Sequence, residues 1–233
     1  MQFKFINFLI ELFQKIVEIF NYLFTNTINE KKFLQKSFSN TENLTIVDIG
    51  ANFGTFSKKI DRFFKNKTLS FHLFEPDPKA FETLTKKFRN NKFKINNLAI
   101  SDTTGEQLFY SNIISSQSSL LENSSILNTK TKEIIVNTSR LDNYIKNNDI
   151  EKIHLLKIDV EGHEENVINS IGDYLNTNFI NNLKIEIQFL SHQNLINIFN
   201  KMYSHNYELI GFSNLKYNKN RLLFVDAYFS ERS

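Results

Sequence analysis

One stretch decides the fold of this chain: Thr45-Ile46-Val47-Asp48-Ile49-Gly50-Ala51-Asn52-Phe53-Gly54-Thr55-Phe56-Ser57. A short run of apolar, β-branched residues ends in an acid, passes two glycines and an asparagine, and opens onto a helical pattern near Phe56. This order predicts a strand, a tight turn and a helix. Gly50, Asn52 and Gly54 tolerate positive φ, and a residue without Cβ lets a ligand lie against the backbone. An ordinary turn, in which Gly54 allows close packing, explains the glycines equally well.

A second stretch favours a ligand site. The largely apolar run from Leu69 to Phe74 predicts another strand, which ends in Glu75 and is followed by the only two prolines of the chain, Pro76 and Pro78. The prolines mark the end of the strand before a helix that starts near Lys79. In open α/β sheets the ligand lies over the carboxyl ends of the strands, and an acid after the second strand binds ribose hydroxyls. Glu75 fits that role.

Composition narrows the function classes. The 233 residues suit one large domain, or one domain with an extension. The net charge of +3 comes from lysines scattered among acids, so we expect no nucleic-acid partner. The absence of cysteine excludes disulfides, thiolate nucleophiles and zinc–thiolate sites, and fits a cytoplasmic protein. Chemistry must come from carboxylates, histidines, lysines, hydroxyls or a cofactor.

The first part of the chain has helical periodicity. Polar residues recur every three or four positions from Gln2 to Phe24 and leave a wide, Phe-rich apolar arc. Recurring charges argue against a membrane-spanning helix and against a cleaved signal peptide. Two interpretations stay open, a helix packed on the domain or on a second subunit of a homo-oligomer, and a peripheral membrane anchor through residues 2–24. A further helical turn or two is expected around Lys31 to Phe38.

The middle of the chain continues the α/β pattern and then breaks it. A helix is predicted over Lys79 to Phe88 and a third strand over Phe93 to Ile100, which completes half of a doubly wound sheet. A β insertion follows, with strands over Glu106 to Tyr110 and Glu133 to Thr138. The Ser/Asn-rich run between them predicts either a plain loop or a lid whose inward-facing part is Ser118-Ser119-Leu120.

A third strand that ends in acids lies further along the chain. After a short helix over Leu141 to Asn147, the run Lys152-Ile153-His154-Leu155-Leu156-Lys157-Ile158-Asp159-Val160-Glu161-Gly162-His163 again passes from an apolar strand through acids to a glycine and a helix that reaches Leu175. Asp159 and Glu161 should lie at the same sheet edge as Gly50 and Glu75.

The C-terminal part completes the predicted sheet. A strand over Leu183 to Phe189 contains Glu186, which should meet a partner or face the site because an unpaired buried carboxylate is costly. A helix over Asn194 to His205 precedes two strands, Tyr207 to Phe212 and Leu222 to Phe229, which predict an antiparallel hairpin. We therefore predict an α/β fold, a mostly parallel sheet with helices on both faces.

Taken together, these motifs resemble the FkbM family of S-adenosylmethionine-dependent methyltransferases. The resemblance runs from about Leu44 to Phe229 and rests on an ordered set of motifs: Val47 to Gly54, Phe74 to Pro78, Asn97 to Asp102, Ser118 to Leu120, Arg140 to Asp142, and Lys157 to Glu164. It implies a Rossmann-like class I methyltransferase sheet over residues 44–233, preceded by a helical extension over residues 1–43. Gln188 departs from the family, which often has histidine there.

The resemblance also implies residue roles. Asp48, Gly50, Asn52 and Gly54 would line the methionine end of S-adenosylmethionine, and Glu75 would hold its ribose. Those expected near the adenine are Asn97, Ala99 and Ser101. The residues expected to face the transferred methyl and the acceptor are Asp159, Glu161 and His163. The implied reaction is O-methylation of a hydroxyl on a sugar, polysaccharide or natural product, so the partner would be a small-molecule or glycan acceptor.

The residue types are compatible with that chemistry. Methyl transfer from a sulfonium depends on in-line placement of the acceptor, and a hydroxyl acceptor benefits from a general base. Asp159 is the first candidate for the base and Glu161 the second. His163 is a natural base by its pKa, but a histidine at the first turn of a helix is more often a capping or packing residue. We expect no required metal, although Asp159, Glu161 and Glu186 provide the hard oxygen ligands of a divalent cation as an alternative.

Two other functions stay open at this point. A nicotinamide-dependent oxidoreductase would also use the first strand, its turn and Glu75, but the turn lacks the three-glycine fingerprint. A catalytically silent protein of the same fold would use the Phe-rich helix to recruit partners to a membrane. Binding of S-adenosylmethionine, of a dinucleotide or of neither separates the three.

Overall fold

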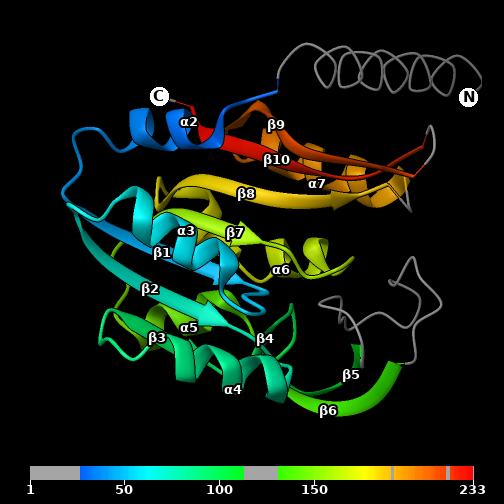
Figure 1. The fold of residues 1–233 in the computed structure, drawn as a ribbon. Coiled ribbons are helices and arrows are strands. Elements are labelled where there is room, and N and C mark those ends of the chain that lie inside the picture. The colour runs from blue at the N-terminus through cyan, green and yellow to red at the C-terminus, as the bar shows by residue number, and fades with distance from the viewer. Residues whose placement is uncertain (1–26, 113–130, 190–191, 219–220, 233) are drawn as a thin grey trace, which may run out of the picture.

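The computed structural model describes residues 27–112, 131–189, 192–218 and 221–232 (Figure 1). The predicted helix over residues 2–24 and the predicted lid residues Ser118 to Leu120 lie outside them. The chain forms a seven-stranded sheet in the order β3-β2-β1-β7-β8-β10-β9 and a three-stranded sheet in the order β4-β6-β5. Among the described helices, none combines the length and the apolar character needed to cross a membrane.

The large sheet is mostly parallel, as predicted. Its strands are β1 (Asn43–Ile49), β2 (Thr68–Phe74), β3 (Phe93–Asn96), β7 (Ile153–Ile158), β8 (Ile180–Gln188), β9 (Tyr207–Asn218) and β10 (Arg221–Glu231). The four pairs among β3, β2, β1, β7 and β8 are parallel, and only β10 runs antiparallel to its neighbours β8 and β9. The predicted C-terminal hairpin is therefore confirmed, with longer strands than the periodicity indicated.

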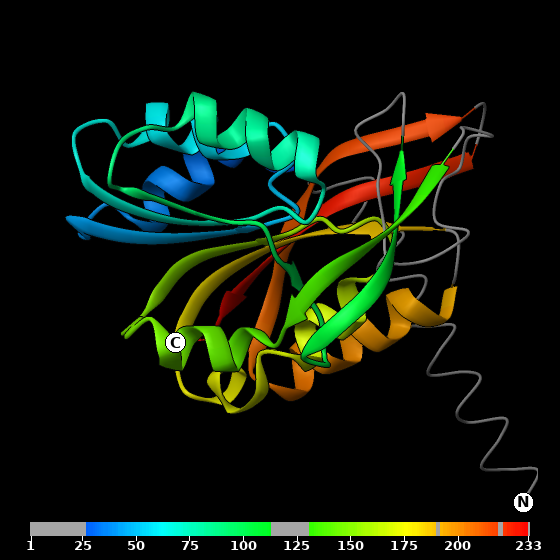
Figure 2. The same cartoon turned by 90° about the horizontal axis from the view of Figure 1, so that it is seen from below.

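Helices cover both faces of the large sheet. They are α2 (Glu30–Ser37), α3 (Thr55–Phe63), α4 (Pro78–Lys87), α5 (Leu141–Asn147), α6 (Glu164–Asn169), α7 (His192–Ser204) and a 3-10 helix η1 (Gly172–Asn176). Figure 2 shows α2, α3 and α4 on one face and α5, α6 and α7 on the other. A separate apolar core lies under each layer, and full burial of each leucine or isoleucine side chain contributes about 1.5–3 kcal/mol.

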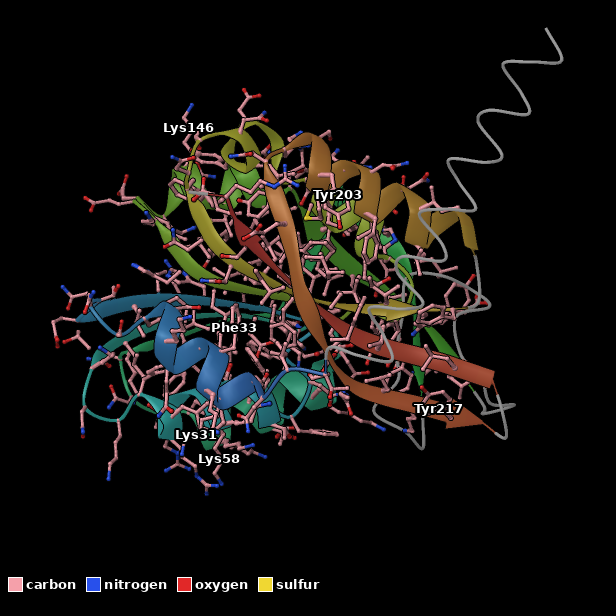
Figure 3. All side chains as sticks on the ribbon, turned by 90° about the horizontal axis from the view of Figure 1, so that it is seen from above. Lys31, Phe33, Lys58, Lys146, Tyr203 and Tyr217 are labelled. Atoms are coloured by element: carbon pink, nitrogen blue, oxygen red, sulfur yellow. The ribbon has the colours of Figure 1, made fainter. Side chains whose placement is uncertain are left out.

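Helix α2 belongs to the predicted extension but packs into a core of the domain. Leu34 and Phe38 are buried in the same cluster as Ile46 of β1. The ring of Phe33 meets the ring of Tyr228 of β10 edge-on, with 5.8 Å between centroids. Phe33 lies on the sheet side of α2, whereas Lys31 points away (Figure 3). This helix therefore covers the sheet where β10 runs.

The predicted third strand is two strands. The pattern from Phe93 to Ile100 splits into β3, which ends at Asn96, and β4 (Ala99–Ile100), which pairs with β6 in the small sheet. The cause is Asn97, whose side-chain amide donates to the backbone oxygens of Glu75 (2.9 Å) and Pro76 (3.0 Å). These bonds fix the chain to the end of β2 and turn it out of the large sheet. The predicted insertion is the antiparallel pair β5 (Gly105–Asn112) and β6 (Thr131–Ser139).

The predicted helix that reaches Leu175 is also interrupted. Helix α6 ends at Asn169, and the chain continues as η1 from Gly172. Gly172 has φ +59°, a left-handed conformation that a continuous α-helix does not contain. An added Cβ at this position would lie 2.8 Å from the carboxylate of Asp142, so both the turn and the contact require glycine.

Candidate functional site

A cavity of about 840 Å³ opens at the carboxyl ends of β1, β2, β7 and β8. Its volume lies within the range of about 300–1,000 Å³ that is usual for small-molecule sites. The β5–β6 hairpin contributes Phe109 to its wall, and the β9–β10 hairpin contributes Asn214 and Lys216. Strands β5 and β6 and the far ends of β9 and β10 extend past the carboxyl ends of β1 and β7 (Figure 1). The sheet edge at which the acids were predicted therefore forms the floor of a cavity, and β5 on one side and β9 with β10 on the other form its walls.

The loop after β1 brings two strand ends together. The backbone N–H groups of Gly50 and Ala51 both donate to the backbone oxygen of Phe74, at 3.1 and 2.9 Å. Gly50 has φ +75°, and an added Cβ would lie 1.8 Å from the backbone oxygen of Asp159. Glycine is thus required because the ends of β1 and β7 touch here. Asn52, with φ +50°, continues the turn along the cavity wall.

Glu75 lies in this wall as a buried carboxylate. Its two oxygens accept hydrogen bonds from the backbone N–H groups of Asn52 (2.7 Å) and Asp77 (2.8 Å). Burial raises the pKa of Glu75 to about 7, although both hydrogen bonds act in the opposite direction. Each oxygen keeps a second lone pair that a hydroxyl group can use.

A lysine at the centre of the sheet ties the strand ends together. The Nζ atom of Lys157 lies 3.2 Å from Asp48 Oδ1 and 3.2 Å from Asp159 Oδ2, and it donates to the backbone oxygen of Gly50 at 2.7 Å. Burial would lower the pKa of Lys157, but the carboxylates of Asp159 and Asp48 raise it above the usual value. Lys157 therefore stays charged and fixes the carboxylate of Asp159 at the cavity.

A second buried lysine stands beside the first. Lys184 of β8 is the register partner of Lys157 of β7. Its Nζ atom lies 2.8 Å from Asp226 Oδ2 and 3.6 Å from Glu30 Oε1. The ring of Phe56 lies under both ammonium groups, with its centroid 5.2 Å from Lys184 Nζ and 6.0 Å from Lys157 Nζ. One aromatic face thus supports both cations.

Three carboxylates meet at the mouth of these strands. Asp159, Glu161 and Glu186 each present an oxygen, and these atoms all lie within 4.8 Å of one another. Burial, followed by the charge of Asp159, raises the pKa of Glu161 to about 8 and that of Glu186 to about 10. Gln188 donates from Nε2 to Glu161 Oε2 at 2.6 Å. We call Asp159, Glu161 and Glu186 the acid cluster.

His163 lies in the cavity wall next to the acid cluster. Its Nε2 is 3.0 Å from Ser101 Oγ, and that hydroxyl donates to Asp102 Oδ1 at 3.2 Å. Since the serine proton is used on Asp102, His163 Nε2 is the donor of the pair and Nδ1 carries the lone pair. Nδ1 is buried and has no hydrogen-bond partner among the described residues. Burial lowers the pKa of His163, which favours the neutral ring.

The structure brings most of the predicted site residues together. Those that line the cavity are Gly50, Asn52, Glu75, Ala99, Asp159, Glu161 and His163. Glu186, predicted to meet a partner or to face the site, lines it as well. The predicted common edge of Asp159, Glu161, Gly50 and Glu75 is confirmed.

Four predicted cofactor residues lie behind the cavity wall. Asp48 is fully buried and binds the Ser57 hydroxyl (2.6 Å) and Lys157. Gly54 faces α4, because an added Cβ would lie 2.2 Å from the ring of Phe88. Asn97 and Ser101 hold the backbone after β2 and the ring of His163, as described above. These four residues therefore support the residues that line the cavity, and they do not line it themselves.

Sequence reasoning missed the three buried charged residues that β7, β8 and β10 contribute to the cavity, Lys157, Lys184 and Asp226. A signal for the lysines was present, because each interrupts an otherwise apolar strand, as Glu186 does. A lysine inside a buried strand needs a carboxylate partner. The partners come from other strands, so the pairing becomes visible only once the strand order is known.

Comparisons with known proteins agree with this geometry. The family model described as the methyltransferase FkbM domain matches residues 48–209, well over half of the chain. The chain belongs to the FkbM methyltransferase family. Its resemblance to that family, inferred from the motifs, is confirmed, and the matched range contains every predicted catalytic and cofactor residue.

Solved structures show the same fold as this FkbM-family chain. One is the methyltransferase FkbM from Methylobacillus flagellatus KT, with 16% identity and a TM-score of 0.58 over 81% of this chain; the match covers 44% of the other chain. Another is an rRNA methylase from Streptococcus thermophilus, with 10% identity and a TM-score of 0.50 over 88% of this chain and 95% of the other. These likenesses confirm the predicted class I methyltransferase fold. A search of curated protein sequences finds no match.

Proposed function

We propose that this chain is an S-adenosylmethionine-dependent methyltransferase that methylates a hydroxyl group of a sugar, polysaccharide or natural product. The observation that carries the proposal is the cavity itself. It has a nucleoside-type wall at Gly50, Asn52 and Glu75, and a carboxylate edge at Asp159 and Glu161 directly beside it. Membership of the FkbM methyltransferase family supports methyl transfer as the reaction.

The residues of the nucleoside-type wall fit the cofactor. The free lone pairs of the Glu75 carboxylate suit the two ribose hydroxyls. An apolar part of the wall suits the adenine ring, and it is formed by Leu98, Ala99, Ile100 and Phe109. The turn from Gly50 to Asn52 would hold the methionine end against the backbone. When bound, the cofactor supplies an electrophilic methyl group.

The carboxylate edge would receive the acceptor. With the cofactor bound, the hydroxyl oxygen would take the methyl group in line with the carbon–sulfur bond, and the electron pair of that bond would stay on sulfur. The hydroxyl proton passes to a carboxylate, for which we propose Asp159. Its side chain is 33% exposed and is held by Lys157, whereas Glu161 is held by Gln188. Placement of the two reactants contributes most of the acceleration.

The cofactor is tested by isothermal titration calorimetry of the full chain. We expect binding of S-adenosylmethionine and S-adenosylhomocysteine and no binding of NAD. Glu75→Ala should weaken both cofactor forms without loss of the folded state by circular dichroism. If NAD binds and the sulfonium cofactor does not, the oxidoreductase hypothesis replaces this one.

The reaction is tested with a panel of hydroxylated acceptors and a methyl-labelled cofactor. Asp159→Asn should abolish label transfer while calorimetry still shows cofactor binding. Transfer to a nitrogen or carbon acceptor, with none to hydroxyl groups, would contradict O-methylation and leave methyl transfer intact. Retained transfer in Asp159→Asn would exclude Asp159 as the proton acceptor.

A further inference from the structure

The acid cluster contains a buried carboxylate without a partner. Glu186 is only 8% exposed, and it makes no hydrogen bond or ion pair with any residue that the structure describes. Its carboxylate points at Asp159 and Glu161, which are carboxylates as well. A buried carboxylate is normally paired or bound to a metal, because its desolvation is otherwise uncompensated. A cation bound at this position would compensate the desolvation of the Glu186 carboxylate.

The neighbouring lysines do not supply that cation. Lys157 is already shared by Asp48 and Asp159, and Lys184 is shared by Asp226 and Glu30. Each ammonium group thus already pairs with two carboxylates, and neither ammonium group lies within ion-pair distance of Glu186. The cavity edge carries more negative than positive side chains as a result.

Gln188 adds a second observation, independent of the acids. It is 7% exposed and lies two residues after Glu186 on β8. Its amide group reaches the acid cluster, because Nε2 donates to Glu161 Oε2 at 2.6 Å. The other amide atom, Oε1, is buried without a hydrogen-bond partner among the described residues. The amide group that contacts Glu161 therefore carries an unused carbonyl-type oxygen.

We infer that Asp159, Glu161 and Glu186, with Gln188 at their side, form a binding site for a hard divalent cation of the Mg²⁺, Mn²⁺ or Ca²⁺ class. Such ions take oxygen ligands at about 2.0–2.6 Å, so ligand atoms of one ion lie within about 5 Å of one another. The oxygens of the acid cluster meet that condition at 4.8 Å. Nitrogen and sulfur ligands, which would favour softer metals, are absent from the cluster.

The site itself does not depend on the proposed reaction. Its use does rest on the proposed function, because the ion would lie where the acceptor oxygens are expected and would orient them. A carboxylate oxygen bound to an ion cannot accept a proton at the same time. With the ion bound, Asp159 would therefore act as a ligand, and the proton would have to leave by another group.

Mn²⁺ is the probe that tests this site. The full-length protein is freed of metal with EDTA and gel filtration, and Mn²⁺ is added while free Mn²⁺ is followed by its EPR signal. We expect one saturable site per chain, from which Mg²⁺ or Ca²⁺ displaces Mn²⁺ and K⁺ does not. Glu186→Gln and Asp159→Asn should each weaken binding at least about tenfold, as expected for loss of a ligand group.

A matched control and a second variant keep the test decisive. Asp226→Asn removes a buried acid that is the register partner of Glu186 but is held by Lys184, so it should weaken Mn²⁺ binding far less. If Glu186→Gln does not fold, Glu161→Gln answers the same question. No saturable binding by the folded wild type, or wild-type affinity in both ligand variants, overturns the inference. Cofactor calorimetry in EDTA is measured separately, so failure of the proposed function would be recognised independently.

Discussion

Glu75 combines two roles that depend on its protonation. Because burial raises its pKa to about 7, the folded protein holds a proton on Glu75 that the unfolded chain has already released between about pH 4.5 and 7. The free energy of unfolding therefore falls as the pH rises through that window. The ionised form is also the better acceptor for ribose hydroxyls, so cofactor affinity should rise over the same window.

Glu75→Gln should remove both pH dependences. As the pH rises from 5 to 8, the free energy of unfolding of the wild type should fall by up to about 3 kcal/mol relative to that of the variant. The reason is that folding raises the pKa of Glu75 from 4.5 to about 7. Urea denaturation at a series of pH values measures it, and calorimetry of S-adenosylhomocysteine follows the affinity. Parallel stability profiles for variant and wild type would contradict the buried, protonated Glu75.

Gly50 is the residue where two strand ends are in contact. In Gly50→Ala, the new methyl group would lie 1.8 Å from the backbone oxygen of Asp159, and φ +75° would add strain. Gly105→Ala is the matched control, since Gly105 also has positive φ, +143°, but an added Cβ meets nothing within 4 Å. We expect Gly50→Ala to lose at least about 3 kcal/mol and Gly105→Ala about 1–2 kcal/mol, by thermal or urea unfolding. Equal losses would mean that strain alone acts.

At the scale of elements, α2 is fixed to the sheet by one half-buried carboxylate, that of Glu30. Glu30 accepts a hydrogen bond from the Tyr228 hydroxyl (2.6 Å) and pairs with Lys59 and with Lys184. Burial alone would raise the pKa of Glu30, but Lys184 and the hydrogen bonds from Lys59 and Tyr228 lower it. The stabilisation is therefore present above the unfolded pKa and is lost as the pH falls through the folded value.

Glu30→Gln should cost about 1–3 kcal/mol near pH 7, typical for hydrogen bonds to a charged group. The loss should shrink toward zero as the pH falls through the lowered pKa of the folded carboxylate, because the wild-type Glu30 is then protonated too. Urea unfolding at a series of pH values measures it. Glu82→Gln, at an exposed pair with Lys86 on α4, is the control and should leave stability unchanged. A loss that is independent of pH would assign the effect to packing of α2.

The elements also show which parts of the fold local sequence determines. Periodicity predicts α5 with its observed bounds, because its apolar spacing and its flanking residues are local signals. Periodicity wrongly joins β3 and β4 into one strand. The break between them depends on hydrogen bonds from Asn97 to residues at the end of β2, which a local pattern does not contain. The periodicity also extends α6 through Gly172, whereas the backbone N–H of Asp142 donates to the Ser170 oxygen directly after α6 ends. Each error lies where a distant residue decides the backbone.

The same distinction holds for the candidate site. Glu75, Asp159 and Glu161 follow directly from strands that end in acids, so their common edge could be predicted. The roles of Asp48 and Gly54 could not, since both have the residue types of a ligand loop while their partners are Lys157 and α4. The pairing of charges across strands needs the order of β1, β7, β8 and β10, which no local pattern contains.

At the scale of the whole molecule, two rows of charge cross the sheet below the cavity. Asp48 and Lys184 are the register partners of Lys157 on either side, and Glu186 and Asp226 are paired in the next row. In the first row, Lys157 and Lys184 lie over the Phe56 ring of α3. In the second row, Glu186 and Asp226 line the cavity. The sheet centre thus holds Asp159 in place through Lys157, which is itself paired with Asp48 of β1.

Lys157 is the common member of this arrangement, so its removal should affect the whole molecule. Lys157→Met leaves Asp48, which is 0% exposed, without its ammonium partner, and we expect a loss of about 3–5 kcal/mol in free energy of unfolding. Asp48→Asn combined with Lys157→Met removes both charges and should recover a large part of that loss. Lys79→Met, at an exposed lysine of the same cavity wall, is the control and should change stability little. A double-mutant cycle by urea denaturation gives the coupling energy, and additive losses would show that Asp48 and Lys157 stabilise the sheet independently.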